Sequence, residues 1–266
     1  MLRAVLFDMD GVLYNADRLI PGAVETVAWL RGRRIPFRFV TNTTSRGRDA
    51  LVDKLHGFGI PAAEQDILTP AVALADWLRS NGEGPAAFFV RPRTLREFAG
   101  IPSVPDDAES GAAYVVIGDL GELWDYRTLN RAFRLLHNNP QAQLIALGMT
   151  RFWLAADGIS LDVAPFVAAL EHATGRKALV FGKPAERFFL AAAAELAAEP
   201  GEIAMIGDDL RADVGGAQAA GMRGVLVRTG KFRPSDLDST PAPDAVLDSV
   251  ADVPGWWETR GEGPRP

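Results

Sequence analysis

The sequence predicts an α/β fold in which a parallel sheet carries helices on both faces and is interrupted by an inserted α/β domain. Short, wholly apolar runs, typical of strands buried on both faces, alternate with segments that repeat apolar residues at helical spacing. A glycine- and proline-containing stretch, Asn81–Pro85, interrupts the alternation, which regains its first form after Lys177. We therefore expect a core domain at 1–75 and 178–266 and an inserted domain at 76–177.

The first elements follow from local residue patterns. An apolar strand at 4–7, a helix at 23–30 and a strand at 37–40 form a βαβ unit. The remaining core elements are expected as helices at 46–55, 71–78, 185–198 and 211–220, and as strands at 178–181, 203–206 and 224–227. Alternating strands and helices in the insert are expected at 87–90, 94–98, 113–117, 126–136, 144–147 and 165–173.

Composition narrows the function classes. The chain has 266 residues, 48% of them hydrophobic and 23% charged, as in an ordinary globular protein. Its 28 basic and 34 acidic residues give a net charge of −6, which disfavours nucleic acid or an anionic membrane as a partner. The absence of cysteine excludes disulfides, thiolate nucleophiles and cysteine-ligated zinc. Without a signal sequence or an apolar run of about 20 residues, we expect a cytoplasmic protein that does not span a membrane.

Two carboxylates follow the first expected strand. They are Asp8 and Asp10, in the segment Phe7-Asp8-Met9-Asp10-Gly11. In an extended chain alternate side chains point the same way, so both can face one site, while Gly11 permits a sharp turn. In an open α/β sheet the carboxyl ends of the strands are where ligands bind. The alternative is an acidic turn with no ligand.

Hydroxyl groups and one lysine follow two other strands. Thr41 and Asn42 end the strand at 37–40 and precede a helix, where free N–H groups and hydroxyls can bind an anion. Plain capping of that helix by Thr44 or Ser45 is the alternative. Lys183, before a proline that opens a helix, can neutralise a phosphate or a carboxylate, unless it is simply solvated.

Three acids follow the strand at 203–206. Asp208, Asp209 and Asp213 offer oxygen ligands without histidine or cysteine, a set that suits Mg²⁺. An acidic helix N-terminus is the alternative, and it explains Asp209 better than Asp208. Because all four segments end strands of one sheet and combine acids, hydroxyls and a lysine, we expect them to form one site.

In these four segments the chain resembles the haloacid dehalogenase superfamily of phosphohydrolases. The resemblance lies in Asp8-Met9-Asp10-Gly11, Thr41-Asn42, Lys183 and Gly207-Asp208-Asp209 through Asp213. The insert of about a hundred residues looks like the large α/β cap of the subfamily that includes 4-nitrophenyl and pyridoxal phosphate phosphatases. Further segments look nearer to the phospholysine phosphohistidine inorganic pyrophosphate phosphatases. The resemblance implies a Rossmann-like parallel core with an inserted α/β cap domain.

The resemblance also implies a role for each residue. Asp8 would be the nucleophile that forms an aspartyl-phosphate, and Asp10 the general acid and then the base. Thr41 and the backbone of Asn42 would hold the phosphoryl oxygens, and Lys183 would offset the charge of nucleophile and phosphate. The cofactor Mg²⁺ would take Asp8, the Asp10 carbonyl and Asp208, while Asp209 or Asp213 would act through water or through Lys183.

The cap carries substrate specificity in this family. The expected specificity residues are Arg151, Phe152 and Trp153, although Phe152 and Trp153 could instead belong to the cap core. Relatives have two tyrosines where this chain has Phe152 and Trp153, so a more apolar contact with the substrate is expected. Asp162 also departs from the family, in which glycine is common. As an insert at the rim of the site, the cap is expected to act as a lid.

The expected function is hydrolysis of a small phosphate ester with Mg²⁺. A metal-free dehalogenase is one alternative, although that chemistry uses no proton donor such as Asp10 and no metal ligand such as Asp208. A phospho-acceptor signalling module is another, although such receiver domains are about half this length and lack a cap. Homodimerisation through the cap is expected as a possibility from the family, and no residue pattern fixes it.

Overall fold

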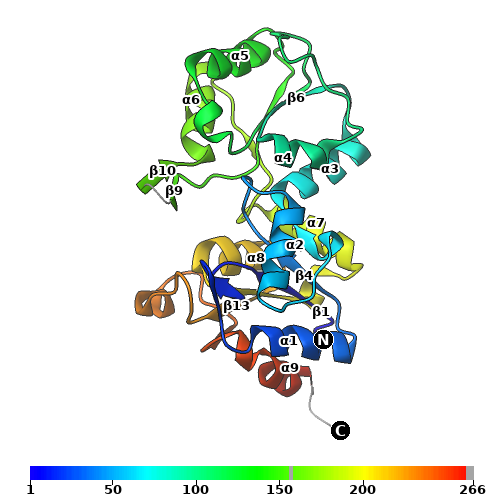
Figure 1. Ribbon diagram of the computed structural model, residues 1–266, viewed down its shortest axis with the longest axis vertical. Coiled ribbons are helices and arrows are strands. Elements are labelled where there is room, and N and C mark those ends of the chain that lie inside the picture. The colour runs from blue at the N-terminus through cyan, green and yellow to red at the C-terminus, as the bar shows by residue number, and fades with distance from the viewer. Residues whose placement is uncertain (156–157, 262–266) are drawn as a thin grey trace. The chain divides into compact units, whose positions relative to one another are not determined.

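The computed structural model describes residues 1–155 and 158–261 as two compact units (Figure 1). The core unit comprises Met1–Thr41, Arg48–Leu68 and Lys183–Pro266, and the inserted unit comprises Asn42–Gly47 and Thr69–Gly182. These bounds differ from 75/76 and 177/178 for two reasons. Helix α3 (Pro70–Asn81) packs with the inserted unit, and the strand predicted for the core at 178–181 forms β11 (Leu179–Val180), which joins the sheet of the inserted unit. The Trp77 ring on α3 lies edge-on to the rings of Tyr114 and Phe181.

A six-stranded parallel sheet forms the centre of the core unit, which confirms the predicted α/β class. The strand order is β14-β13-β12-β1-β4-β5, with parallel pairing throughout. The strands are β1 (Ala4–Asp8), β4 (Phe37–Val40), β5 (Ile67–Leu68), β12 (Ile203–Gly207), β13 (Arg223–Val227) and β14 (Ala245–Leu247). Every residue of β1 and β12 is buried, as expected for strands covered on both faces.

Helices cover both faces of this sheet. On one face, apolar residues of α1 (Ala23–Arg33), α2 (Arg48–Gly57) and α9 (Val253–Gly261) pack against alternate residues of β1 such as Val5 and Phe7. On the other, α7 (Glu186–Leu196) contacts β4 and the short helix α8 (Gly216–Ala219). The predicted helix at 211–220 is instead a π-helical turn, Leu210–Gly215, followed by α8. Both layers leave the carboxyl ends of the strands to the loops.

The inserted unit is a separate α/β body. Its parallel sheet has the order β11-β8-β7-β6. The strands are β6 (Ala86–Phe89), β7 (Tyr114–Ile117), β8 (Gln143–Ala146) and β11 (Leu179–Val180), and the helices besides α3 are α4 (Pro92–Leu95), α5 (Tyr126–His137) and α6 (Val163–Thr174). Buried residues of α5 and α6 form one apolar cluster with the sheet. The segment at 94–98, which the alternation of strands and helices predicted as a helix, is helical.

Two antiparallel hairpins were not predicted. One joins β2 (Tyr14–Asn15) to β3 (Arg18–Leu19) in the core unit. The other joins β9 (Phe152–Ala155) to β10 (Gly158–Leu161) in the inserted unit. Both are too short and too exposed to show the alternation of buried and polar residues on which a sequence prediction depends. The predicted tail beyond residue 261 lies outside the described residues.

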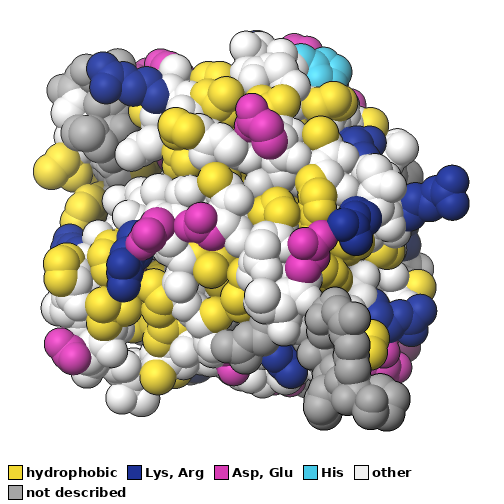
Figure 2. Space-filling view, turned by 90° about the horizontal axis from the view of Figure 1, so that it is seen from below, with side chains coloured by type: hydrophobic (Ala, Val, Ile, Leu, Met, Phe, Trp, Pro, Cys, Tyr) yellow, Lys and Arg dark blue, Asp and Glu magenta, His cyan; other side chains and the backbone are white. Residues whose placement is uncertain are grey.

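The surface carries charges of both signs. On the face seen in Figure 2, acidic and basic side chains are interspersed with apolar ones, and in places lie next to each other, in the coloured, described part of the chain. Within the stretches 1–155 and 158–261, no helix is long and apolar enough to cross a membrane.

Candidate active site

Three of the predicted segments meet at the carboxyl edge of the core sheet. Asp8 is the last residue of β1 and pairs with Val40, the last residue of β4. Thr41, the next residue after Val40, therefore lies at the same edge of the sheet as Asp8. On the other side of β1, Asp208 follows Gly207, the last residue of β12. Parallel neighbouring strands end at one edge, and for this reason residues 200 positions apart in sequence come together.

A buried cluster of carboxylates lies at this edge. Asp8, Asp208 and Asp213 each offer one oxygen, and these oxygens lie within 4.8 Å of one another. It is the one group of this kind found among the residues described. The Lys183 ammonium lies 2.7 Å from Asp8 Oδ1 and 2.7 Å from Asp213 Oδ1. Three negative charges therefore face a single buried positive charge, which leaves an excess of negative charge in the cluster.

This excess shifts the acid–base equilibria of the cluster. Burial, together with the charges of Asp8 and Asp213, raises the pKa of Asp208 to about 7. Burial also raises the pKa of Asp213 to about 6, although Lys183 opposes that shift. For Lys183, burial favours the neutral amine, but Asp213 and Asp8 outweigh it and raise the pKa above its usual value. Lys183 is consequently a permanent ammonium at physiological pH.

The cluster fits a divalent cation. Asp208 Oδ1 is fully buried without a hydrogen-bond partner, which is costly unless something else satisfies it. Oxygen ligands alone are the set preferred by Mg²⁺, and one or two carboxylates suffice for it. A cation beside Asp8 and Asp208 would offset the charge that Lys183 leaves uncompensated. The residues present therefore fit Mg²⁺.

Glycines allow the backbone to approach the carboxylates. A Cβ on Gly11, where φ is +92°, would lie 2.0 Å from Asp208 Oδ2. A Cβ on Gly207 would lie 2.2 Å from the Cβ of Asp213. Only glycine therefore fits at either position. At Gly11 both the positive φ and the close contact exclude a side chain, and at Gly207 the close contact alone does. The sequence predicted that Gly11 permits a turn. In the structure, its lack of a side chain also leaves room for the Asp208 carboxylate.

Asp10 and Asp209 lie apart from the buried cluster. Asp10 is exposed, and its Oδ1 accepts a hydrogen bond from Ala16 N at 3.2 Å, which ties it to the turn of the first hairpin. Asp209 caps the π-helical turn, where its Oδ1 accepts from Arg211 N and Ala212 N. The helix-capping alternative therefore describes Asp209, as the sequence favoured, whereas Asp213 contacts Lys183 directly.

The segment after Thr41 belongs to the inserted unit. Thr44 is buried there, its hydroxyl accepts from Asp119 N at 3.1 Å, and its carbonyl accepts from Thr94 Oγ1 at 2.7 Å. Helix α2 begins only at Arg48, so capping by Thr44 or Ser45 is not the role of these residues. The predicted contacts of Thr41 and Asn42 with a phosphoryl group stay predictions.

One segment near the cluster was missed from the sequence. Residues Thr229–Lys231 follow β13, and Lys231 N donates a hydrogen bond to Asp208 Oδ2 at 2.7 Å. The Lys231 ammonium lies 3.5 Å from Asp209 Oδ2. Two signals were available: β13 was predicted and must end at the same sheet edge, and lysine is rare in this chain. Neither was used, because this segment offers no carboxylate and only the single hydroxyl of Thr229.

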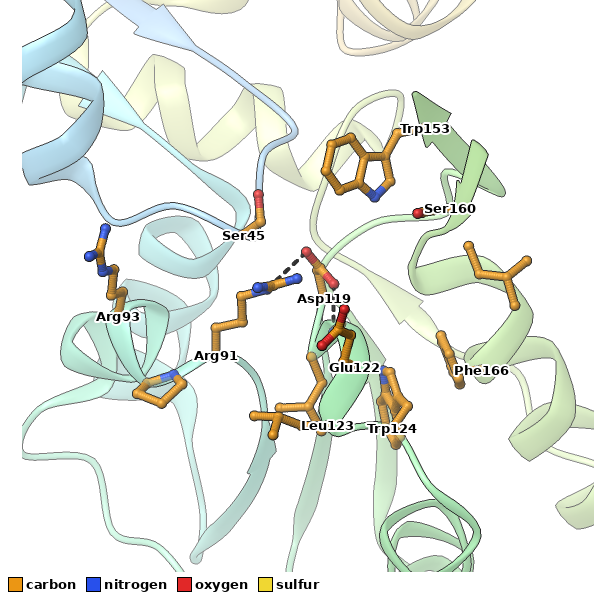
Figure 3. A pocket seen from close by; sticks show the side chains of 14 residues that line it. Ser45, Arg91, Arg93, Asp119, Glu122, Leu123, Trp124, Trp153, Ser160 and Phe166 are labelled. Atoms are coloured by element: carbon orange, nitrogen blue, oxygen red, sulfur yellow. Dashed lines mark hydrogen bonds and ion pairs between the residues drawn. The ribbon is translucent and has the colours of Figure 1, made fainter. Parts of the chain in front are cut away.

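The inserted unit has a pocket of about 930 Å³ of its own (Figure 3). Trp153 is 43% exposed, with its indole drawn beside the pocket opposite Arg91 and Asp119, which form an ion pair at 3.2 Å. Phe152 is 52% exposed and lies under the Arg151 guanidinium, 5.8 Å from ring centre to Cζ. Phe152 and Trp153 are thus surface residues, not cap core, and Trp153 alone of the three expected specificity residues lines this pocket.

The departure at Asp162 has a local explanation. Asp162 precedes helix α6 with an extended φ of −107°, and its Oδ1 accepts from Val163 N at 2.8 Å. Glycine's conformational freedom is therefore not needed at this position, and aspartate serves as a helix cap. Burial, with the nearby charge of Asp119, raises the pKa of Asp162 to about 6 despite the hydrogen bond from Val163.

Comparison with known proteins gives consistent matches. Residues 5–100 match the family "Haloacid dehalogenase-like hydrolase", and residues 180–253 match a second family described as HAD-hydrolase-like. The bovine haloacid dehalogenase-like hydrolase domain-containing protein 2 is 43% identical over 93% of each chain. Human phospholysine phosphohistidine inorganic pyrophosphate phosphatase is 41% identical over 95% of this chain and 93% of that one. The crystal structure of a 4-nitrophenylphosphatase from Thermotoga maritima superposes with a TM-score of 0.84 at 27% identity, over 95% and 96% of the two chains.

Proposed function

The chain belongs to the haloacid dehalogenase-like hydrolase family and is a phosphatase, and we propose that it hydrolyses a small phosphate ester with Mg²⁺ through an aspartyl-phosphate on Asp8. The observation that carries the proposal is the buried Lys183 ammonium, 2.7 Å from both Asp8 and Asp213, beside the unpartnered Oδ1 of Asp208. Such a site supplies a fixed nucleophile and a place for a cation in one buried cluster.

Asp8 is the nucleophile in this proposal. Its carboxylate oxygen attacks phosphorus in line with the ester bond, the new O–P bond forms, and the bond to the leaving oxygen breaks. Lys183 holds Asp8 in place and stays protonated, because Asp213 and Asp8 both raise its pKa. Bound Mg²⁺ would be held by Asp8, Asp208 and the Asp10 carbonyl, and would offset the negative charge of carboxylates and phosphate.

Asp10 moves the protons. It donates one to the leaving oxygen in the first step, and its carboxylate then removes one from the water that attacks the phosphorus of the aspartyl-phosphate. That second step frees inorganic phosphate and restores Asp8 and the protonated Asp10. The exposed position of Asp10 supports this part, since a group that exchanges protons with leaving group and water needs access to both.

Phosphoryl contacts and specificity complete the proposal. Thr41 and the backbone of Asn42 are proposed to hold phosphoryl oxygens, and Asp213 to fix Lys183. Arg151, Phe152 and Trp153 are proposed to select the substrate, with Trp153 contributing most because it lines the pocket of the inserted unit. The 4-nitrophenyl ester in the name of one structural neighbour makes 4-nitrophenyl phosphate a sensible first substrate. The lid action of the insert, cytoplasmic location and homodimerisation stay predictions.

Trapping the intermediate tests this proposal. The full-length protein is mixed with 4-nitrophenyl phosphate and Mg²⁺, quenched in acid and treated with borohydride, which reduces an aspartyl-phosphate to homoserine. Peptide mass spectrometry should find homoserine at position 8, and excess chelator should abolish both this signal and phosphate release. Phosphate release without modification at position 8, or full activity in chelator, would refute the mechanism. An aspartyl-phosphate that persists after substrate removal would point instead to a phospho-acceptor module.

A further inference from the structure

A three-residue segment that follows β13 is hydrogen-bonded to two of the catalytic segments. The Thr229 hydroxyl donates to the carbonyl of Gly11, in the turn that follows Asp8 and Asp10. Two residues later, Lys231 N donates to Asp208 Oδ2 at 2.7 Å. Since β13, β12 and β1 are neighbours in the sheet, this segment reaches from the third strand to the loops of the other two. We call residues Thr229–Lys231 the clamp.

The middle residue of the clamp lies directly against both loops. Gly230 has a φ of +60°, and a Cβ there would lie 2.0 Å from Asp208 Oδ2 and 2.6 Å from Gly11 Cα. A Cβ on Gly11 would lie equally close to the same oxygen, at 2.0 Å. Asp208 Oδ2 is therefore enclosed by the backbone of two glycines and bonded by the N–H of Lys231. No side chain could be added at either glycine without moving this carboxylate.

We propose that the clamp is a positioning element that fixes which oxygen of Asp208 is presented for Mg²⁺. Oδ2 is occupied by the clamp, whereas Oδ1 is buried and without a hydrogen-bond partner. A carboxylate held through one oxygen is confined to one orientation, so its other oxygen points consistently into the cluster with Asp8. The Thr229 bond does the same for the turn at Gly11, next to the Asp10 carbonyl. This inference rests on the proposed function and adds residues that the four segments do not contain.

The expected effect is on metal affinity more than on chemistry. Partners that orient metal ligands typically contribute a factor of about 10 to 100 in metal affinity. Without the clamp, Asp208 must be ordered at the moment of binding, so the dissociation constant for Mg²⁺ rises. At saturating Mg²⁺ the same site forms, and the catalytic residues are unchanged. A structural role alone would instead lower stability and leave metal affinity as it was.

The first experiment removes the Thr229 bond. Mg²⁺ binding to the metal-free full-length protein is measured by calorimetry for wild type, Thr229→Val and Thr229→Ser, together with the melting temperature in chelator. We expect Thr229→Val to raise the dissociation constant about 10-fold, with kcat for 4-nitrophenyl phosphate at saturating Mg²⁺ within about threefold of wild type. Thr229→Ser keeps the hydroxyl and should restore wild-type affinity.

Thr26→Val is the matched control. Thr26 is buried in α1 of the same unit, and its hydroxyl donates to the Val250 carbonyl at 2.9 Å, a bond of the same kind without a catalytic loop. This variant should lose stability but bind Mg²⁺ as wild type does. An unchanged dissociation constant in Thr229→Val, or an equal increase in Thr26→Val, would overturn the inference. If wild type itself binds no Mg²⁺, the proposed cofactor fails instead, so the two failures are distinguishable.

A glycine pair gives a second, independent test. Gly230→Ala adds a methyl group where Asp208 lies, whereas Gly59→Ala adds one at a φ of +78° that meets nothing within 4 Å. Both variants bear the strain of an alanine in the left-handed region. Only Gly230→Ala should raise the dissociation constant for Mg²⁺, by 10-fold or more. An equal dissociation constant for Mg²⁺ in the two variants would show that Gly230 is needed only for its backbone conformation, and the inference would be withdrawn.

Discussion

The carboxylate cluster of the core unit and the pocket of the inserted unit handle charge in opposite ways. In the cluster, Lys183 and its partners are almost fully buried, so a single ammonium fixes two carboxylates. In the pocket, the Arg91 side chain that pairs with the buried Asp119 is 39% exposed, and Trp153 is a surface residue. Losing a partner in a buried ion pair leaves an uncompensated charge, whereas water screens the loss at a surface.

This contrast suits two different tasks, phosphoryl transfer in the carboxylate cluster and the proposed substrate selection at the pocket. Phosphoryl transfer needs charges whose positions do not change between substrates, and close packing provides them. In the proposed function, substrate selection falls to exposed hairpin residues, which can change without disturbing the fold. Changes in the cluster should therefore affect all substrates, while changes at the pocket should affect some. Three predictions test this division, beginning with the largest effect, and a fourth tests how burial acts on a charge in the inserted unit.

Asp8→Asn should lower kcat at least about 10⁴-fold for every substrate, because the nucleophile is lost. The asparagine fills the same space and removes one of three crowded negative charges, so the melting temperature in chelator should not fall. Phosphate release from several esters, circular dichroism and thermal melting check the three parts. Multiple turnover above a trace level would contradict the assignment of Asp8.

Asp10→Asn should act according to the leaving group. An alkyl phosphate needs a proton on its leaving oxygen, so its first step should slow by about 10²- to 10⁴-fold, whereas nitrophenolate leaves with little help. Single-turnover bursts measure the first step for each ester directly. An equal loss for both esters would contradict the role of Asp10 as general acid. It would also weaken the distinction between residues that affect all substrates and residues that affect only some.

Trp153→Ala should change the order of substrate preference. We expect the stabilisation of the transition state, calculated from kcat/KM, to fall by about 1–3 kcal/mol for esters with large leaving groups. For small leaving groups it should change little. Arg151→Ala should have a smaller effect, because Arg151 lies on Phe152 and does not line the pocket. Ile159→Ala, a change on the same hairpin at a 74% exposed side chain, is the control. A uniform loss with a lower melting temperature would assign these residues to structure.

The smallest effect concerns two helix caps in the inserted unit. The pKa of Asp162 is raised to about 6 by burial, so the folded state binds its proton more tightly, and stability falls as pH rises from about 4 to about 6. Asp162→Asn keeps the capping oxygen and removes this fall, a gain on the order of 1 kcal/mol above pH 6 after solvent screening. Urea unfolding at pH 4 and pH 7 measures it.

Asp125 provides the control of opposite sign. It caps α5 by accepting from Thr128 N at 2.7 Å, and this bond lowers its pKa. Its contribution to stability is therefore present above its unfolded pKa and is lost as pH falls. Asp125→Asn should lose stability at pH 7 relative to pH 4, the reverse of Asp162→Asn. The same sign in both variants would show that burial is not what sets the Asp162 equilibrium.

Residues close to a predicted strand end were the most predictable part of the site. Asp8, Lys183 and Asp208 were expected together because parallel strands end at one edge, and the structure brings them together. The reason holds for Asp8 and Asp208 only, because the strand before Lys183, β11, belongs to the sheet of the inserted unit. The choice between Asp209 and Asp213 was left open, since four residues of ordinary helix carry two acids on one side. In the π-helical turn the two side chains make different contacts: Asp213 pairs with Lys183, while Asp209 caps the turn. Which of them acts on the metal stays a prediction.

The sequence by itself determined the α/β class, the order of most elements and the four chemical segments, because each depends on short-range periodicity and on residue type. Only the tertiary structure decided the rest: that Lys183 lies between Asp8 and Asp213, that α3 packs with the insert, that Trp153 is exposed, and that the clamp holds Asp208. These facts depend on contacts between residues far apart in the chain, whose distances are set by the packing of whole layers. Local sequence carries no measure of such distances.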